Sequence, residues 1–139
     1  MKLLAAVVGM VLASGSITES FAHEGHGTTP GSVQAPHGGV IRGTKSLYLE
    51  LVNDASGLKL YPLTHELAPI PLAELTLSAT AQVPKKAKVP VKLLTSGDHF
   101  EADAAALVSV KGAYRYQLEV NTGYHGKKEK VVFQMEPQN

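Results

Sequence analysis

The sequence predicts an all-β protein: a single antiparallel β-sandwich, immunoglobulin-like, preceded by a disordered, histidine-containing N-terminal tail. Apolar and polar residues alternate in several short runs, among them 47–52, 75–81 and 131–135. Alternation with a period of two places one face of a strand on a core and the other toward water. Turn-forming residues such as Asn-Asp-Ala-Ser-Gly at 53–57 separate the runs. A small barrel is the second architecture compatible with seven or so short strands.

Each predicted strand rests on its own alternation or on the turns that bound it. The runs 89–95 and 99–102 are divided by Ser-Gly-Asp at 96–98, a turn sequence. The remaining strands are predicted from residues of alternating polarity whose apolar members form one face. These members are Leu47, Leu49 and Leu51; Leu58 and Leu60; Leu75, Leu77, Ala79 and Ala81; Tyr114, Tyr116, Leu118 and Val120; and Val131, Phe133 and Met135.

The N-terminal region divides into two segments ahead of the domain. Lys2, an apolar run over 3–13 and the small residues Ser20 and Ala22 form the pattern of a cleavable secretory signal, so residues 1–22 are predicted to be removed. The apolar run is shorter than the roughly 20 residues that a membrane-spanning helix requires, so no span is expected after cleavage. Residues 23–36 are rich in Gly, Thr, Ser and Pro and are predicted to be a disordered leader. The sandwich domain is predicted over 37–139.

Composition excludes several classes of function. The chain has no cysteine, which excludes disulfides, thiolate metal ligands and cysteine nucleophiles. The formal net charge is +1, so there is no broad basic surface for nucleic acid. There is no Gly-x-Ser-x-Gly motif and no glycine-rich phosphate loop. The sequence therefore predicts an exported, periplasmic protein that is not an enzyme.

The histidines are the side chains best suited to bind a metal ion. Imidazole is the commonest metal ligand that needs no thiol, and nitrogen and oxygen donors favour copper(II), with zinc as a further possibility. In the leader, His23 and His26 flank Glu24 and Gly25. Cleavage after Ala22 would make His23 the first residue, so that its α-amine and imidazole form a chelate for copper(II). The leader is therefore a candidate metal site.

A second candidate site lies at the start of the domain. His37 precedes Gly38 and Gly39, Glu50 lies on the polar face of its strand, and His65 follows the strand after it. If these two strands pair through the 53–57 loop, His37, Glu50 and His65 can converge at one end of the hairpin. Each residue also has a purely structural interpretation: His37 as a turn residue, Glu50 as an exposed carboxylate on a strand, and His65 as a loop residue on the surface. His99 and His125 are expected to be structural or solvent-exposed.

Four motifs together resemble small periplasmic metal-handling proteins and the N-terminal module of heavy-metal efflux adaptor (membrane fusion) subunits. The motifs are His-Glu-Gly-His at 23–26, Pro-His-Gly-Gly at 36–39, Leu-Glu-Leu-Val at 49–52 and Leu-Lys-Leu-Tyr at 58–61. The resemblance implies a role in metal binding or efflux, with His37 and Glu50 as inherited ligands and an efflux component as a partner. Some relatives carry a histidine shortly before the strand glutamate, where this chain has Tyr48.

Three functions are therefore compared. The first is a non-catalytic, periplasmic metal-binding protein for copper or a similar divalent cation, acting in buffering, delivery or efflux. The second is a metal-independent, immunoglobulin-like interaction module, because a sandwich fold alone does not specify function. The third is an oxidative copper enzyme built on the N-terminal histidine, which a mobile leader disfavours because catalytic metals need a rigid set of ligands.

Overall fold

The computed structural model of the chain describes residues 33–103, 107 and 115–136. The predicted signal sequence and most of the predicted leader, including His23 and His26, lie outside these residues. A single turn of 3-10 helix, η1 (Leu72–Glu74), precedes the fourth strand. The described strands are β1 (Val40–Gly43), β2 (Tyr48–Asp54), β3 (Gly57–Leu63), β4 (Leu75–Gln82), β5 (Val89–Val91), β6 (Leu93–Ser96), β7 (His99–Ala102), β8 (Tyr116–Tyr124) and β9 (Lys127–Met135).

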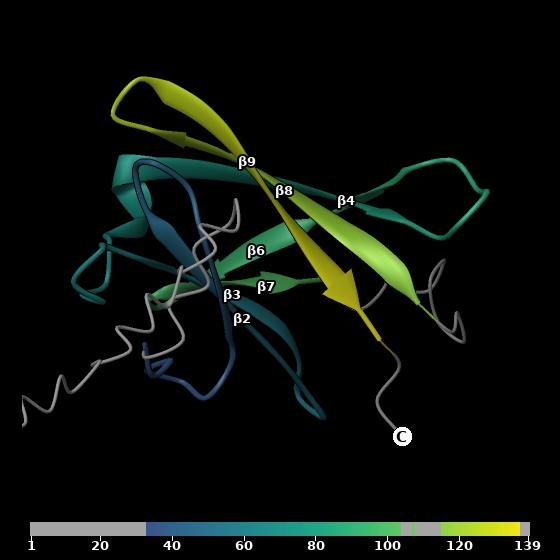
Figure 1. Ribbon diagram of the computed structural model, residues 1–139, viewed down its shortest axis with the longest axis horizontal. Helices are drawn as coiled ribbons and strands as arrows, with labels where there is room; N and C mark the ends of the chain where they lie inside the picture. Colours follow the sequence, from purple (N-terminus) through teal and green to yellow (C-terminus); the bar gives the residue numbers. More distant parts are fainter. Residues whose placement is uncertain (1–32, 104–106, 108–114, 137–139) are drawn as a thin grey trace, which may run out of the picture.

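The strands form two antiparallel sheets that pack face to face (Figure 1). One sheet has the order β1-β2-β3-β7-β6 and the other the order β5-β4-β8-β9. Without β1, these orders correspond to the A-B-E-D and C′-C-F-G sheets of immunoglobulin-type sandwiches. The predicted all-β, immunoglobulin-like sandwich is therefore confirmed. β1 is an extra strand beside β2, which corresponds to strand A.

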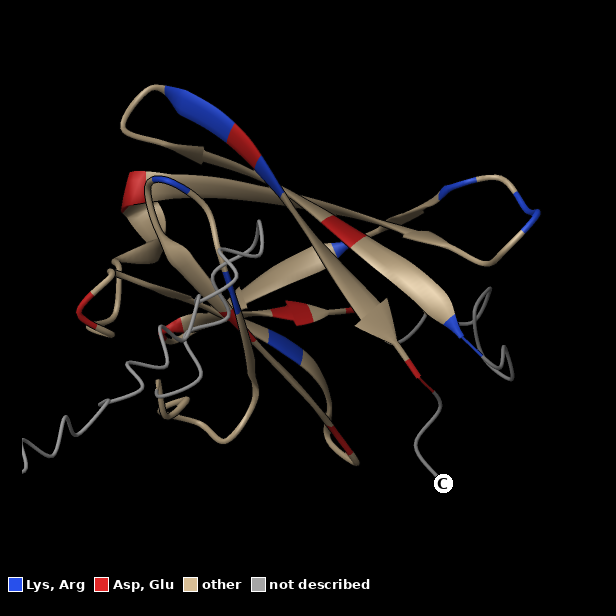
Figure 2. Ribbon diagram, in the orientation of Figure 1, with Lys and Arg blue, Asp and Glu red and all other residues tan. Residues whose placement is uncertain are grey.

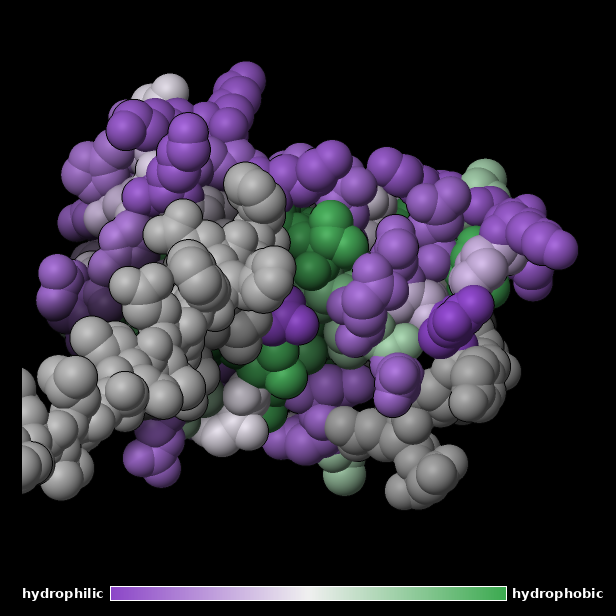
Figure 3. Space-filling model, in the orientation of Figure 1, coloured by the Kyte–Doolittle hydropathy of each residue, from purple (hydrophilic) through white to green (hydrophobic). Residues whose placement is uncertain are grey.

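The core lies between the sheets and consists largely of the residues that alternation assigns to the inner faces. Leu47, directly before β2, and Leu49 and Leu60 of the first sheet are fully buried, and so are Leu118 and Val120 of the second. Burying a side chain of this size is worth roughly 1.5–3 kcal/mol, so this layer supplies most of the stability of the fold. In the view of Figure 3, hydrophilic residues make up most of the coloured surface, and a patch of hydrophobic residues is visible near its centre.

The β2–β3 hairpin forms as the 53–57 sequence predicts. Asp54 pairs with Gly57 across a two-residue turn, and the backbone N–H of Ser56 donates to the Asp54 carboxylate at 2.8 Å. Pro62 lies within β3, opposite Leu49. The sheet accommodates it because β7 pairs with β3 only at Lys59 and Leu60, so no strand needs a donor on that side of Pro62.

Two strand assignments differ from the prediction. β1 was not anticipated, because four residues are too few to show a period of two. The run expected over 89–95 divides at Lys92 into β5 and β6, which belong to opposite sheets. The carbonyl of Lys92 accepts a hydrogen bond from the N–H of Asp103, which fixes the crossing between sheets. The chain thus changes sheet inside what looks like one strand.

Lysines gather at two places on the second sheet (Figure 2). One group, Lys127, Lys128 and Lys130, lies on the edge strand β9, and the other, Lys85, Lys86 and Lys88, lies in the β4–β5 loop. Charged residues on an edge discourage pairing with a strand of another molecule. Within the described part of the chain, no helix has the length and apolar character needed to cross a membrane.

Candidate functional site

The outer face of the five-stranded sheet holds a fully buried carboxylate. Glu50 lies between Leu49 and Leu51 in β2, so alternation directs it away from the core, yet its exposed fraction is 0%. Its Oε1 accepts hydrogen bonds from the backbone N–H of His37 at 2.8 Å and of Gly39 at 3.0 Å. The segment 33–39, here called the N-terminal strap, therefore covers Glu50 and is tied to it through its backbone.

The strap reaches Glu50 because its glycines permit two unusual features. Gly38 has a φ of +74° and its N–H donates to the carbonyl of Ala35 at 3.1 Å, which closes a turn. At Gly39, a Cβ atom would collide with the backbone carbonyl oxygen of Leu51. The Pro-His-Gly-Gly sequence therefore builds a tight turn that packs directly on β2.

The imidazole of His37 is held on two sides. Its Nδ1 lies 2.8 Å from Oε2 of Glu50, and its ring stacks on Tyr61 with centroids 3.7 Å apart and an interplanar angle of 14°. The side chain retains an exposed fraction of 32%. Tyr61 lies opposite Glu50 in the β2–β3 register, so one pair of neighbouring strands provides both contacts.

The contact with Glu50 distinguishes the two ring nitrogens of His37. An ionised carboxylate only accepts hydrogen bonds, so Nδ1 is the donor when Glu50 is ionised. The lone pair of a neutral ring is then on Nε2, and none of the described residues hydrogen-bonds to that atom. Metal-binding histidines are commonly oriented in this way, by a carboxylate on the nitrogen that does not face the metal. Glu50 thus occupies the position of an orienting group, whereas the sequence suggested a ligand.

A second histidine, His99, which the sequence predicts to be structural or solvent-exposed, also contacts Tyr61. The ring of His99 is 4.8 Å from that of Tyr61 and tilted by 37°. Its Nδ1 lies 3.0 Å from Asp98 Oδ1 and its Nε2 lies 2.9 Å from Glu101 Oε1. The sequence did contain a signal for this cluster, because carboxylates precede His99 by one residue and follow it by two. In a strand, the residue two positions on shares the same face.

Charged and buried groups around His99 shift the pKa values of several side chains on this face. Burial lowers the pKa of His99, but the hydrogen bonds to Glu101 and Asp98 outweigh burial, and the net pKa is raised. The hydrogen bond from His99 lowers the pKa of Asp98, and the charge of His37 contributes in the same direction. Burial raises the pKa of the Tyr61 hydroxyl. His37, Tyr61 and His99 therefore belong to one electrostatically connected face.

His65 does not join the His37–Glu50 pair. Its Nε2 lies 3.3 Å from the carbonyl oxygen of Thr44, and its exposed ring packs edge-on against Tyr48 at 4.7 Å. His65 is therefore held at the β1–β2 loop rather than beside Glu50. Across residues 33–103, 107 and 115–136, no three His, Asp or Glu side chains are grouped so that they could hold a metal ion. The described domain thus offers one oriented imidazole, not a complete coordination sphere.

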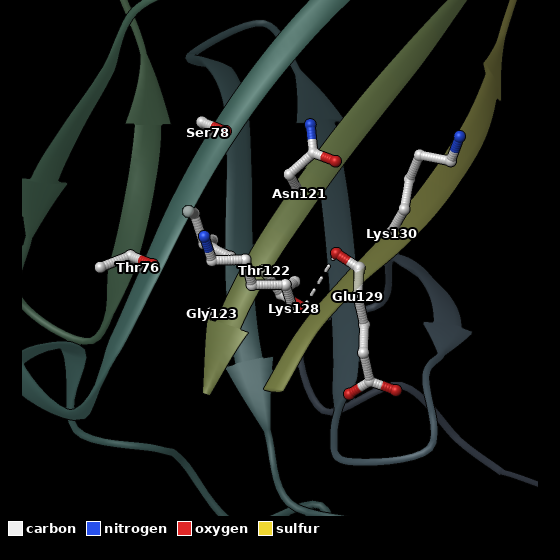
Figure 4. A pocket seen from close by; sticks show the side chains of 9 residues that line it. Thr76, Ser78, Asn121, Thr122, Gly123, Lys128, Glu129 and Lys130 are labelled. Carbon is white, nitrogen blue, oxygen red and sulfur yellow. Dashed lines mark hydrogen bonds between the residues drawn. The ribbon is translucent and has the colours of Figure 1, made fainter. Parts of the chain in front are cut away.

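A hollow of about 600 Å³ lies on the other sheet (Figure 4). Thr76 and Ser78 of β4, Asn121 of β8, and Lys128 and Lys130 of β9 surround it. Gly123 forms part of its lining, where a Cβ atom would approach the Thr76 hydroxyl to 2.5 Å. Two ammonium groups repel a divalent cation, so this hollow is unsuited to the metal chemistry that the sequence predicts.

Comparisons with known proteins add no family to this description. No family model, curated protein or solved structure matches the chain. Function is therefore inferred from the residues and their geometry.

Proposed function

We propose that the chain is an exported, non-catalytic protein that binds a divalent metal ion in the periplasm, with copper(II) favoured and zinc as the alternative ion. Buffering, delivery to a partner and efflux are the roles compatible with such binding, and the resemblance to efflux adaptor modules supports the last of these. The observation that carries the proposal is the His37–Glu50 contact, which leaves Nε2 of a fixed ring as the available nitrogen.

The remaining ligands are proposed to come from the leader. His26 precedes His37 by eleven positions in the sequence, and a chain reaches at most about 3.6 Å per residue. His26, His23 and the α-amine that cleavage after Ala22 would create are therefore within reach of His37. A short tether raises the effective concentration of such donors to the order of millimolar, which favours one shared site. In this proposal Glu50 orients His37 and does not contact the metal.

The test is a titration of the mature chain, residues 23–139, with copper(II) chloride and separately with zinc chloride. Electron paramagnetic resonance counts the nitrogens bound to copper, and NMR follows each imidazole as zinc is added. We expect one equivalent to shift His37, His23 and His26 together. His37→Asn is the informative variant, because an asparagine amide nitrogen occupies nearly the position of Nδ1 and keeps a donor for Glu50, but Nε2 is lost.

His125→Asn is the matched control for that variant. His125 is exposed at the β8–β9 turn with a φ of +50°, a conformation that asparagine tolerates. It also removes one imidazole, but from the end of β8, away from Glu50. We expect His37→Asn to weaken copper binding at least tenfold and His125→Asn to leave it unchanged. Equal affinities of the two variants would contradict the proposal, and so would zinc that moves no imidazole at equimolar concentration.

A metal-independent interaction module is the second candidate, and one observation favours it. The outer strands of the five-stranded sheet carry the large exposed hydrophobic residues Val40 and Leu94, which are 48% and 45% exposed. β6 has no charged residue and β1 has only Arg42, and edges with so few charges are available for pairing with another strand. This function predicts self-association or partner binding that persists in EDTA and is lost in Leu94→Lys, whereas under the metal proposal EDTA removes the bound ion and with it the function.

A further inference from the structure

We infer that His99 regulates cation binding at His37: because both imidazoles contact Tyr61, a proton on His99 and a metal ion on Nε2 of His37 oppose each other. The inference rests on the proposed function, since it concerns the same site. It adds a group that is not itself a ligand, and it makes metal affinity depend on pH through a second histidine.

The geometry that carries the inference is the contact of both imidazoles with one tyrosine ring. Between ring centroids, Tyr61 lies 3.7 Å from His37, which is stacked on it, and 4.8 Å from His99, which is tilted against it. The two imidazoles are therefore linked through contacts with the same aromatic ring. At a separation set by two such contacts, and with an effective dielectric constant between that of protein and water, one positive charge changes the affinity for another by roughly tenfold.

His99 is placed to hold its own proton rather than a metal. Both ring nitrogens face carboxylate oxygens, Oδ1 of Asp98 and Oε1 of Glu101, and the exposed fraction of the side chain is only 15%. A ring with both nitrogens donating is an imidazolium. The raised pKa of His99, described above, is consistent with this contact pattern.

The other charged groups around His99 come from three neighbouring elements. Lys59 of β3 lies opposite Glu101 in the register, Glu50 of β2 lies opposite Tyr61, and His37 lies on the strap. On β6, the residue opposite His99 is Ser96, which does not titrate in the neutral range. Asp98 and Glu101 are therefore the charges that contact His99, and His37 is the cation site that contacts the same tyrosine ring.

Thermodynamic linkage requires the effect to be reciprocal. If a proton on His99 weakens metal binding at His37 by a given factor, metal at His37 weakens proton binding at His99 by the same factor. The affinity for metal therefore falls as pH falls through the titration of His99. This decrease adds to the ordinary competition between proton and metal for the nitrogen of His37.

The decisive experiment is an NMR pH titration of the His99 imidazole in the mature chain, with and without saturating zinc chloride. Zinc is the probe because copper(II) broadens nearby signals. We expect zinc to lower the midpoint of the His99 titration by about one pH unit. This shift corresponds to the roughly tenfold loss of proton affinity that linkage requires. His37 must shift in the same samples, which establishes that zinc is bound there.

Two variants separate regulation by a proton from a general effect of charge. His99→Gln keeps a donor for Glu101 and removes the titrating ring, so we expect zinc affinity at pH 6 to rise about tenfold and the difference to vanish at high pH. Lys59→Gln removes a lysine charge from the same face, so we expect its effect on zinc affinity to be the same at pH 6 and pH 8.

The outcomes distinguish this inference from the proposed function. Zinc that shifts His37 while the His99 midpoint stays fixed would overturn the regulation and leave metal binding intact. If zinc shifts no imidazole, both the regulation by His99 and the proposed metal binding are contradicted. The wild-type titration decides the matter even if His99→Gln does not fold.

Discussion

Oε2 of Glu50 lies 2.8 Å from Nδ1 of His37, and the backbone N–H of His37 donates to the other oxygen of the same carboxylate. The side chain and the backbone of His37 thus contact the same buried carboxylate. Together with the N–H of Gly39, they give a fully buried glutamate three donors, and no lysine or arginine among the described residues pairs with it. The carboxylate consequently stabilises the turn that presents His37.

We predict that Glu50→Gln destabilises the fold by about 2 kcal/mol, since hydrogen bonds to a charged group contribute roughly 1.5–3 kcal/mol and the amide turns a donor toward one of the three N–H groups. Urea denaturation followed by circular dichroism measures the change. Glu66→Gln is the matched control, because Glu66 is exposed in the β3–β4 connection and should change stability by less than about 0.5 kcal/mol. Equal stability of the two variants would show that the Glu50 contacts contribute nothing.

Gly39→Ala tests the close approach of the strap to β2. The added methyl group would meet the carbonyl oxygen of Leu51, a backbone atom that cannot move aside cheaply. We expect a loss of at least about 2 kcal/mol in the free energy of unfolding. Gly38→Ala meets no atom within 4 Å but must adopt a φ of +74°, so its loss should be smaller, about 1–2 kcal/mol. The reverse order of the two losses would be incompatible with this packing.

The pH dependence of stability should report the protonation of His99. Its pKa is raised in the folded state, so its contribution is fully present below the unfolded-state value of about 6.5 and is lost as pH rises through the folded-state pKa. Thermal unfolding of the wild type and His99→Gln should therefore differ most in mildly acidic solution and converge at higher pH. A difference that grows with rising pH would have the wrong sign.

Glu129 connects the two sheets at the β1–β2 loop. Its carboxylate accepts hydrogen bonds from the Thr44 hydroxyl at 3.2 Å and from the N–H of Lys45 at 3.0 Å. Glu129→Gln retains one acceptor oxygen, so we expect a loss of about 1 kcal/mol in urea denaturation and faster hydrogen exchange at Lys45. Glu136→Gln, at an exposed position after β9, is the control and should leave both measurements unchanged.

The sandwich was predictable wherever alternation ran over enough residues. The apolar positions in β2, β3, β4 and β9 fall on the inner faces as expected, and the 53–57 turn joins β2 to β3. Where the sequence failed, the cause was local. β1 is too short to show a period, and the crossing at Lys92 interrupts an apparently continuous run without a glycine.

The candidate site was predictable in part. The proximity of His37 and Glu50 followed from the glycine pair and from the hairpin, but the burial of Glu50 did not, because it depends on the strap crossing the outer face. His65 was placed too close to the pair, since the path of a Pro-rich connection cannot be derived from spacing. His99 was missed because its neighbour across the sheet, Tyr61, is set by β3–β7 pairing between strands distant in sequence.

The covered carboxylate also aligns the first strand. β1 has four residues, and its register places Ile41 opposite Glu50. Sliding β1 by one residue would move the donating amides about 3.3 Å along β2 and leave the buried carboxylate without its donors, at a cost of several kcal/mol. A single buried carboxylate can thus set the register of a strand that is too short for hydrophobic matching alone to set it.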